Sequence, residues 1–494
     1  MSRFALISVN ARYYHSSAAL RSLRENARQY KDDITILEFT LDERVSDIVE
    51  KIVDTGCDVA GFSVYIWNVE IISRVVKTLH DLFPKIILIA GGPEVSWEYQ
   101  KTELFSNIDY LITGEGETSF YNLLDSITVG DFPIEKIIKG EITSLDRILY
   151  PVSSYSENDF ATKLIYIETS RGCPFECHFC SSGIDNSIRK FPVERVIEYL
   201  DFLYAKGVRH FKFLDRSILY GPWKSLYAWF LERKTSGISI HFELNPDRIP
   251  ESFIMCLKDL APAKIQLELG VQTFNEEVNK RIGRKQQNVK VLENLKLLVG
   301  MEHIHIHADL IAGLPGETLE SIGESFNMLH STGVEEIQFG ILKRLNGTLI
   351  SAHTDEFKMV YSENPPYEIL QNDTLSFKTV QALKRFARYL DLIGNSGNFL
   401  ICASEIFGEN PFSGLWDFSE WLWKESGQTH KFSRDSLASW IFRYLKEQRK
   451  IQNAELLIKA DYSRLNHIFR ESVLDKSINS KSNFFQRQKK HIKT

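Results

Sequence analysis

The chain lacks several features that mark whole classes of protein. Its 494 residues include no apolar run long enough to span a bilayer, and the start, MSRFALISVNARYYH, has no signal-peptide core. Six cysteines are too few for the dense framework of a secreted disulfide scaffold. A net charge of −6 gives no reason to expect a nucleic-acid partner. We therefore expect a cytoplasmic protein without a membrane segment.

The length and the 43% hydrophobic content allow several buried cores. Usual domain sizes suggest about three domains for such a chain. The predicted division is a ligand-binding α/β domain over 1–141, a linker over 142–160, a partial barrel over 161–350 and a helical extension over 351–494.

The first third repeats one pattern, a short apolar run followed by a turn and a helical segment. Continuous apolar strands that alternate with amphipathic helices predict a parallel sheet covered on both faces, a doubly wound Rossmann-like domain. The predicted strands are Phe4–Val9, Ile34–Phe39, Val59–Val64, Ile86–Ala90 and Tyr110–Thr113.

Small and polar residues follow these strands, where ligands of doubly wound domains bind. Glycine there lets a ligand approach the backbone. The candidates are Asn10, His15, Ser63, Gly91, Gly92, Gly114, Glu115 and Gly116. They predict a site for a large, flat, polar cofactor.

The most specific feature is the cysteine loop Cys173-Pro174-Phe175-Glu176-Cys177-His178-Phe179-Cys180. Three thiolates at this spacing can hold three corners of a [4Fe–4S] cluster and leave the fourth iron open for a substrate or cosubstrate. One alternative is three unrelated thiols or a zinc site, for which His178 would have to turn inward. Another is an iron–sulfur electron carrier or redox sensor, which needs a fully ligated cluster.

The middle third continues with strands separated by helical patterns, which predicts an open partial (βα)6 barrel. The runs are Leu164–Glu168, Val208–Leu214, Ile238–Glu243, Ala263–Leu269, Ile304–Ile311 and Glu336–Leu342. Functional groups of barrels lie at the carboxyl ends of the strands, where the cysteine loop and Asp215 are expected. The alternating His303, His305 and His307 share a strand face, and we interpret His307 as lining the barrel rather than binding a metal.

The cysteine loop, with an aromatic residue before its last cysteine, resembles the signature of the radical S-adenosylmethionine (SAM) enzymes. The segments Glu268–Thr273 and Asp309–Thr318 resemble further motifs of that family. The resemblance implies that the three cysteines hold the cluster and that the open iron binds SAM, which is cleaved to a 5′-deoxyadenosyl radical. It places Phe179, Glu243, Glu268, Gln272, Gly313 and Pro315 near SAM.

The first domain, placed before such a barrel, is similar to the cobalamin-binding domain of the cobalamin-dependent radical SAM group. The D-x-H-x-x-G loop that supplies a cobalt ligand in methionine-synthase-type domains is absent, so we interpret His15 as a pocket or structural residue. The implied cofactors are a [4Fe–4S] cluster, SAM and cobalamin.

The resemblance implies methylation of an unactivated centre, or, alternatively, a radical cyclisation or rearrangement. Methylthio transfer would need a second cluster, and only Cys57 lies in the first domain. The implied partners are a small-molecule or peptide substrate and an external one-electron donor such as flavodoxin or ferredoxin.

The last third is helical and aromatic, and it resembles an uncharacterised extension of one branch of that group. A helix with a serine cap is predicted over Ser376 to Leu392. We interpret the aromatic residues between Phe412 and Trp423 as a helix core. A frayed tail is predicted over 486–494.

Overall fold

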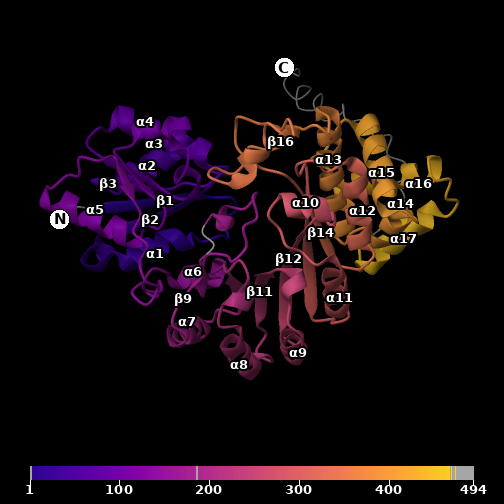
Figure 1. Cartoon of the computed structure of the whole chain (residues 1–494), viewed down its shortest axis with the longest axis horizontal. Coiled ribbons are helices and arrows are strands. Elements are labelled where there is room, and N and C mark those ends of the chain that lie inside the picture. The colour runs from indigo at the N-terminus through magenta and orange to yellow at the C-terminus, as the bar shows by residue number, and fades with distance from the viewer. Residues whose placement is uncertain (1–2, 185–186, 468, 470–472, 474–494) are drawn as a thin grey trace, which may run out of the picture.

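The computed structural model describes residues 3–184, 187–467, 469 and 473. Two six-stranded parallel sheets follow one another along the chain, and a group of helices completes it (Figure 1). The tail predicted over 486–494 lies outside the described residues. Among the described helices, none combines the length and the apolar character that crossing a bilayer requires.

The first sheet is doubly wound. Its strand order is β2-β1-β3-β4-β5-β6, with all pairs parallel. Helices α2, α3 and α4 bury their apolar sides on one face, and α1 and α5 cover the other. The strands are β1 (Phe4–Asn10), β2 (Ile34–Thr40), β3 (Val59–Ser63), β4 (Ile87–Gly91), β5 (Tyr110–Thr113) and β6 (Ile137–Lys139), and the helices are α1 (Ala18–Asn26), α2 (Val45–Asp54), α3 (Val69–Leu82), α4 (Glu103–Asn107) and α5 (Glu117–Val129).

The predicted fold of this part is confirmed, with one added strand. Every residue of β1 is buried, as its continuous apolar run requires in a sheet covered on both faces. The edge strand β6 was not predicted, because its apolar run is only two residues long and the strand is partly or fully exposed.

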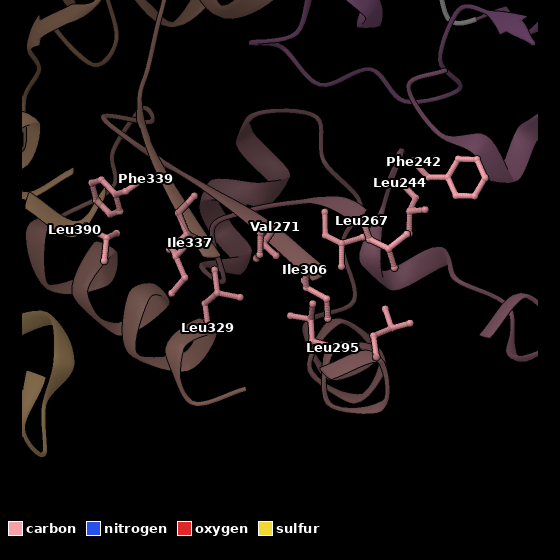
Figure 2. Packing of buried hydrophobic residues seen from close by; sticks show 14 of the residues in the cluster. Phe242, Leu244, Leu267, Val271, Leu295, Ile306, Leu329, Ile337, Phe339 and Leu390 are labelled. Atoms are coloured by element: carbon pink, nitrogen blue, oxygen red, sulfur yellow. The ribbon is translucent and has the colours of Figure 1, made fainter. Parts of the chain in front are cut away.

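The second sheet is an open barrel with the order β14-β13-β12-β11-β10-β7, and all of its pairs are parallel. The predicted partial barrel is therefore confirmed. Figure 2 shows the outward side chains of its strands, such as Leu267, Ile306 and Ile337, packed against the helices. The strands are β7 (Tyr166–Ile167), β10 (His210–Phe213), β11 (Ser239–Leu244), β12 (Lys264–Gln272), β13 (Ile304–Ala312) and β14 (Glu336–Ile341), and the helices are α7 (Val193–Ala205), α8 (Trp223–Arg233), α9 (Glu251–Asp259), α10 (Glu276–Arg281), α11 (Asn288–Val299) and α12 (Leu319–His330).

The segment between the sheets is packed rather than extended. Leu145, Ile148 and Tyr155 are buried in the same core as the barrel strands, and α6 (Glu157–Thr162) follows them. Leu164, predicted to begin a barrel strand, instead pairs with His15 of the first domain. A short antiparallel pair, β8 (Ser170–Arg171) and β9 (Arg189–Lys190), then flanks the cysteine loop.

The C-terminal part is helical, as predicted. The hydroxyl of Ser376 accepts the Thr379 amide and caps α13. Phe412 and Phe418 are buried among the helices and confirm the aromatic core at these positions, whereas Trp423 is 39% exposed and lies outside it. The elements are β15 (Val360–Tyr361), β16 (Ile369–Gln371), α13 (Phe377–Leu390), α14 (Leu400–Phe407), α15 (Pro411–Ser426), α16 (Arg434–Glu447) and α17 (Ala454–Arg464).

Candidate cofactor site

The three cysteines of the loop after β8 lie close together. Cys173 and Cys177 are each 9% exposed, and the Cys180 amide donates to the Cys177 carbonyl over 3.0 Å. Burial raises the pKa of the Cys173 and Cys177 thiols, and the nearby Cys180 raises both further. The guanidinium of Arg284 lies 3.8 Å from the Cys177 sulfur and favours its thiolate. One compact loop thus presents three sulfurs beside a cation.

The imidazole of His178 does not join them. Its Nδ1 lies 2.8 Å from Nε2 of His353, and the two rings stack. Within the described part of the chain, no three His, Cys, Asp or Glu side chains meet closely enough to share one metal ion. The ligands of a cubane bind three different irons and are spaced more widely, so this loop suits a cluster better than a zinc ion.

Asp215, at the end of β10, fastens the backbone that enters the loop. Its carboxylate accepts the Thr169 amide over 2.9 Å and the hydroxyls of Thr169 and Ser170 over 2.6 and 2.5 Å. The side chain is almost completely buried, and burial raises its pKa although these donors oppose the shift. The sequence placed Asp215 at a functional strand end, and the structure gives it a positioning role.

Arg171, two residues before Cys173, joins the two sheets. Its guanidinium contacts Glu115 at 3.0 Å, Glu117 at 2.6 Å and Glu168 at 3.0 Å. Burial raises the pKa of Glu168 to about 7 although Arg171 opposes the shift. Glu115, predicted as a cofactor contact, therefore directs its carboxylate at the cysteine loop. Sequence reasoning missed Arg171, although its place beside the cysteine motif was a usable signal.

A cavity of about 950 Å³ lies between the carboxyl edge of the first sheet and the mouth of the barrel. One wall contains all of the ligand-facing residues predicted for the first domain: Asn10, His15, Ser63, Gly91, Gly92, Gly114, Glu115 and Gly116. The opposite wall includes Gly172, Ser181 and Ser182, which neighbour the cluster cysteines, together with Glu243. The volume is near the upper end for ligand pockets and suits a ligand as large as a corrin.

Glycines keep the wall of the first domain close to the backbone. Gly92 has φ +123°, and a Cβ there would overlap the Val64 carbonyl oxygen. Gly114 has φ +77°, and a Cβ there would meet nothing within 4 Å. The stacked rings of Tyr65 and Trp67, with centroids 4.4 Å apart, line the same wall and were not among the predicted contacts. This wall offers flat and backbone surfaces to a planar ligand.

The polar groups of His15 and Asn10 are engaged within the wall. His15 Nδ1 lies 2.5 Å from the Tyr166 hydroxyl, across the boundary between the two sheets. The Asn10 amide donates to the His15 carbonyl over 3.1 Å and to Glu38 over 3.2 Å. Burial, followed by the charge of Lys212, lowers the pKa of His15. His15 thus helps to hold the two halves of the cavity together.

The predicted SAM contacts lie around the barrel mouth in separate places. Phe179 lines a second cavity of about 530 Å³, together with Ile311 and Leu342. Glu243 borders the large cavity and lies 3.5 Å from Arg216. Glu268 is 3.2 Å from His241 Nε2 inside the barrel. The structure therefore places Phe179, Glu243 and Glu268 around the mouth without bringing them into one pocket.

Three further candidates border neither cavity. A Cβ at Gly313, where φ is +94°, would overlap the side chain of Ile369 from β16. The Pro315 carbonyl accepts Arg281 Nη1 over 2.6 Å. Gln272 leaves its buried Oε1 without a hydrogen-bond partner among the described residues. The three residues therefore lie outside both cavities.

The inner face of the barrel is polar. His307 and Asp309 share it, 3.6 Å apart, and burial raises the pKa of Asp309 to about 8, with Glu268 and Glu243 adding to the shift. The His307 side chain is largely buried on this face, in line with the prediction that it lines the barrel. His303, just before β13, pairs with the Leu257 carbonyl over 2.9 Å.

Models of known families match both sheets. Residues 5–124 match the B12 binding domain, and residues 167–329 match the Radical SAM superfamily. The chain therefore contains a B12-binding domain and a radical SAM domain. Residues 355–493 match a protein family of unknown function, DUF4080, which confirms the predicted uncharacterised extension. These domains bind SAM with a [4Fe–4S] cluster and cobalamin, so the predicted cofactors are confirmed.

Individual relatives agree with this assignment. The cobalamin-dependent radical SAM methyltransferase TokK of Streptomyces tokunonensis is 25% identical over 326 residues, which are 59% of this chain and 47% of that protein. A second relative, a 2-(S-pantetheinyl)-carbapenam-3-carboxylate methyltransferase of Streptantibioticus cattleyicolor, is 26% identical over 58% of this chain and 47% of its own length. The chain thus spans about half the length of these curated relatives.

Two solved structures share the fold. The radical S-adenosylmethionine methyltransferase TsrM from Kitasatospora setae, with cobalamin and a [4Fe–4S] cluster bound, matches with a TM-score of 0.58 at 16% identity, covering 72% of this chain and 78% of that one. The cobalamin-dependent S-adenosylmethionine radical enzyme OxsB, with aqua-cobalamin and SAM bound, gives 0.64 at 13% identity, covering 96% and 83%.

Proposed function

We propose that the chain is a cobalamin-dependent radical SAM enzyme that methylates an unactivated centre of its substrate. The observation that carries this proposal is the cavity of about 950 Å³, which is bordered by the B12-binding domain on one side and the cysteine loop on the other. Bound there, cobalamin supplies the methyl group, and SAM with the cluster supplies the radical. Relatives named as methyltransferases support the same activity.

In this proposal Cys173, Cys177 and Cys180 hold the cluster, and their shared loop supports that role. The backbone around Phe179 contacts the adenine of SAM. Glu243 accepts hydrogen bonds from the SAM ammonium or ribose. The remaining assigned SAM contacts are Glu268 and Gln272 on β12, and Gly313 and Pro315 in the turn that follows β13.

The wall of the first domain would hold the corrin. Ser63, Gly91, Gly92 and Gly114 expose backbone to it, and the remaining wall residues, Asn10, His15, Glu115 and Gly116, shape its edge. In this proposal His15 serves as a wall residue, and the 2.5 Å contact between its Nδ1 and the Tyr166 hydroxyl supports a structural role at the boundary between the two sheets.

The cluster assignment is tested by Cys177→Ala after anaerobic reconstitution. We expect the wild-type chain to show a [4Fe–4S] spectrum that changes when SAM is added, and the variant to form no 5′-deoxyadenosine. Cys256→Ala is the matched control, because Cys256 is a free cysteine on α9, away from the loop. Formation of 5′-deoxyadenosine by Cys177→Ala would contradict the assignment.

The reaction is tested with SAM labelled in its methyl group and cell extract. Label that enters an extract component together with 5′-deoxyadenosine formation supports methyl transfer, whereas 5′-deoxyadenosine without methyl incorporation favours cyclisation or rearrangement. The substrate would be a small molecule or peptide, and a flavodoxin or ferredoxin would supply the electron. None of the six cysteines, all of which lie in the described part of the chain, forms a disulfide, and this supports a reducing cytoplasm as the location.

A further inference from the structure

Residues 343–371, here called the strap, connect β14 to α13. The strap contains a short 3₁₀ turn (Leu349–His353) and the strands β15 and β16. In Figure 1 it is the orange segment around β16, which lies between the first sheet and the C-terminal helices. Its second half falls in the region that matches only a family of unknown function.

The strap binds the loop that follows β4 in the first domain. The Tyr367 hydroxyl donates to Glu94 Oε1 over 2.5 Å, and the Asn346 amide donates to the Glu94 carbonyl over 3.2 Å. Arg344 pairs with Glu98 at 2.6 Å. Glu94 is 4% exposed, so its carboxylate depends on the Tyr367 hydroxyl and on the Asn346 amide, which also lies 3.3 Å from Oε1, in place of water.

This loop is part of the wall of the large cavity. Gly92, Pro93, Ser96 and Trp97 line the cavity, and Asn346 of the strap lines it as well. The ring of Trp97 lies directly against Gly347, where a Cβ would overlap it. The position of the Trp97 ring in the wall therefore depends on the strap.

The strap also holds the opposite wall. The Ile350 amide donates to the carbonyl of His178 over 2.7 Å, and the His353 ring stacks on the His178 ring. His178 directly follows Cys177 in the cysteine loop. One continuous segment thus contacts the loop of the B12-binding domain and the cysteine loop, and it sets the spacing between them.

Tyr367 is the most constrained contact of the strap. Its φ of 56° lies in the left-handed region, which is uncommon for a tyrosine. Such a conformation persists where the surroundings over-determine it. Its main-chain carbonyl accepts the Arg344 amide over 3.0 Å, so Tyr367 and Arg344, which both reach the loop after β4, support each other.

We infer that Tyr367 is a positioning residue for cobalamin: its hydroxyl, bonded to Glu94, holds the loop of residues 92–98 where the cavity admits the corrin. The inference rests on the proposed function and deepens it. It also gives the beginning of the uncharacterised extension a role in the cofactor site.

The test is a titration of the full-length chain with hydroxocobalamin, followed by absorbance. Tyr367→Phe should weaken binding about tenfold, because the buried hydrogen bond to Glu94 is lost and no longer favours the binding-competent arrangement of the loop. Tyr361→Phe is the matched control, since the hydroxyl of this tyrosine in the same strap donates its hydrogen bond within the strap, to the sulfur of Met359 at 3.4 Å, and not to the first domain. It should bind like the wild type.

A double-mutant cycle separates positioning from a general loss of stability. Glu94→Ala removes the acceptor of the Tyr367 hydroxyl and should weaken cobalamin binding about as much as Tyr367→Phe does. Adding Glu94→Ala to Tyr367→Phe should cause little further loss, because both changes remove one contact. If Tyr367→Phe does not fold, Arg344→Gln tests the same loop and should weaken binding about threefold.

Equal affinities in Tyr367→Phe and Tyr361→Phe would overturn the inference and leave the proposed function standing. Failure of the wild-type chain to bind hydroxocobalamin would overturn both. A weakening in Tyr367→Phe alone, with the melting temperature of both variants changed equally, supports the positioning role.

Discussion

Asp215→Ala removes one buried carboxylate that secures the backbone leading into the cysteine loop. The carboxylate accepts three hydrogen bonds from Thr169 and Ser170, which lie 46 and 45 residues away in sequence. Ser170 is three residues before Cys173. The substitution therefore tests whether the barrel strand β10 holds the cluster loop in place.

The loss of folding free energy in Asp215→Ala follows from the hydrogen-bond donors that lose their acceptor. The two hydroxyls can rotate, but the Thr169 amide is fixed by the backbone, and Thr169 is fully buried. A buried donor without a partner costs about 1–3 kcal/mol. The substitution removes the acceptor of three donors, so we expect a total cost of about 2–3 kcal/mol, which favours local opening of the loop that holds the cysteines.

The assay measures iron and sulfide per chain after anaerobic reconstitution, alongside thermal unfolding. Asp215→Ala should retain less than about a tenth of the cluster, because 1.4 kcal/mol corresponds to a factor of ten in an equilibrium and the cost is larger. Asp215→Asn keeps one acceptor oxygen and should lose less.

Asp461→Ala is the matched control. Asp461 is equally buried and accepts the amides of Ile401 and Cys402 in the C-terminal helices. It should lower the melting temperature without lowering the iron content. If Asp215→Ala binds iron like the wild type, the positioning role of Asp215 is wrong.

Three further predictions concern the barrel and the cavity walls. The pKa of the Asp309 carboxyl is near 8 in the folded chain and about 4 in the unfolded chain. The free energy of unfolding of the wild type therefore falls as the pH rises between these values, by at most about 1.4 kcal/mol per pH unit. Asp309→Asn does not titrate, so its melting temperature relative to wild type should be higher at pH 8 than at pH 5. Gly92→Ala should abolish cobalamin binding, because its Cβ would overlap a backbone carbonyl, whereas Gly130→Ala, also at positive φ but in open space, should retain binding; equal binding would refute the argument. Arg171→Met should lower the free energy of unfolding by about 3–5 kcal/mol at neutral pH, because Glu117 stays buried without its cation. The difference in melting temperature from wild type should become smaller below about pH 5, because the depressed pKa of Glu117 no longer stabilises the wild type there.

Much of the fold was predictable because its information is local. Parallel strands buried on both faces need unbroken apolar runs, and that of β1 is evident in the amino-acid sequence. The three cysteines of the cluster loop fall within eight residues, so their spacing alone indicates the chemistry. The glycines after β4 and β5 follow the general rule that ligands bind beyond the carboxyl ends of strands.

The links between these parts depend on residues that are far apart in sequence. Arg171 meets Glu117 across 54 positions, and Tyr367 meets Glu94 across 273. No periodicity or local motif reports such pairs, because a side chain selects its partner by packing in three dimensions and not by its neighbours in the chain. The amino-acid order therefore specifies which chemical groups and cofactors belong to this protein, whereas tertiary packing decides how the cobalamin wall and the cluster loop are held facing each other.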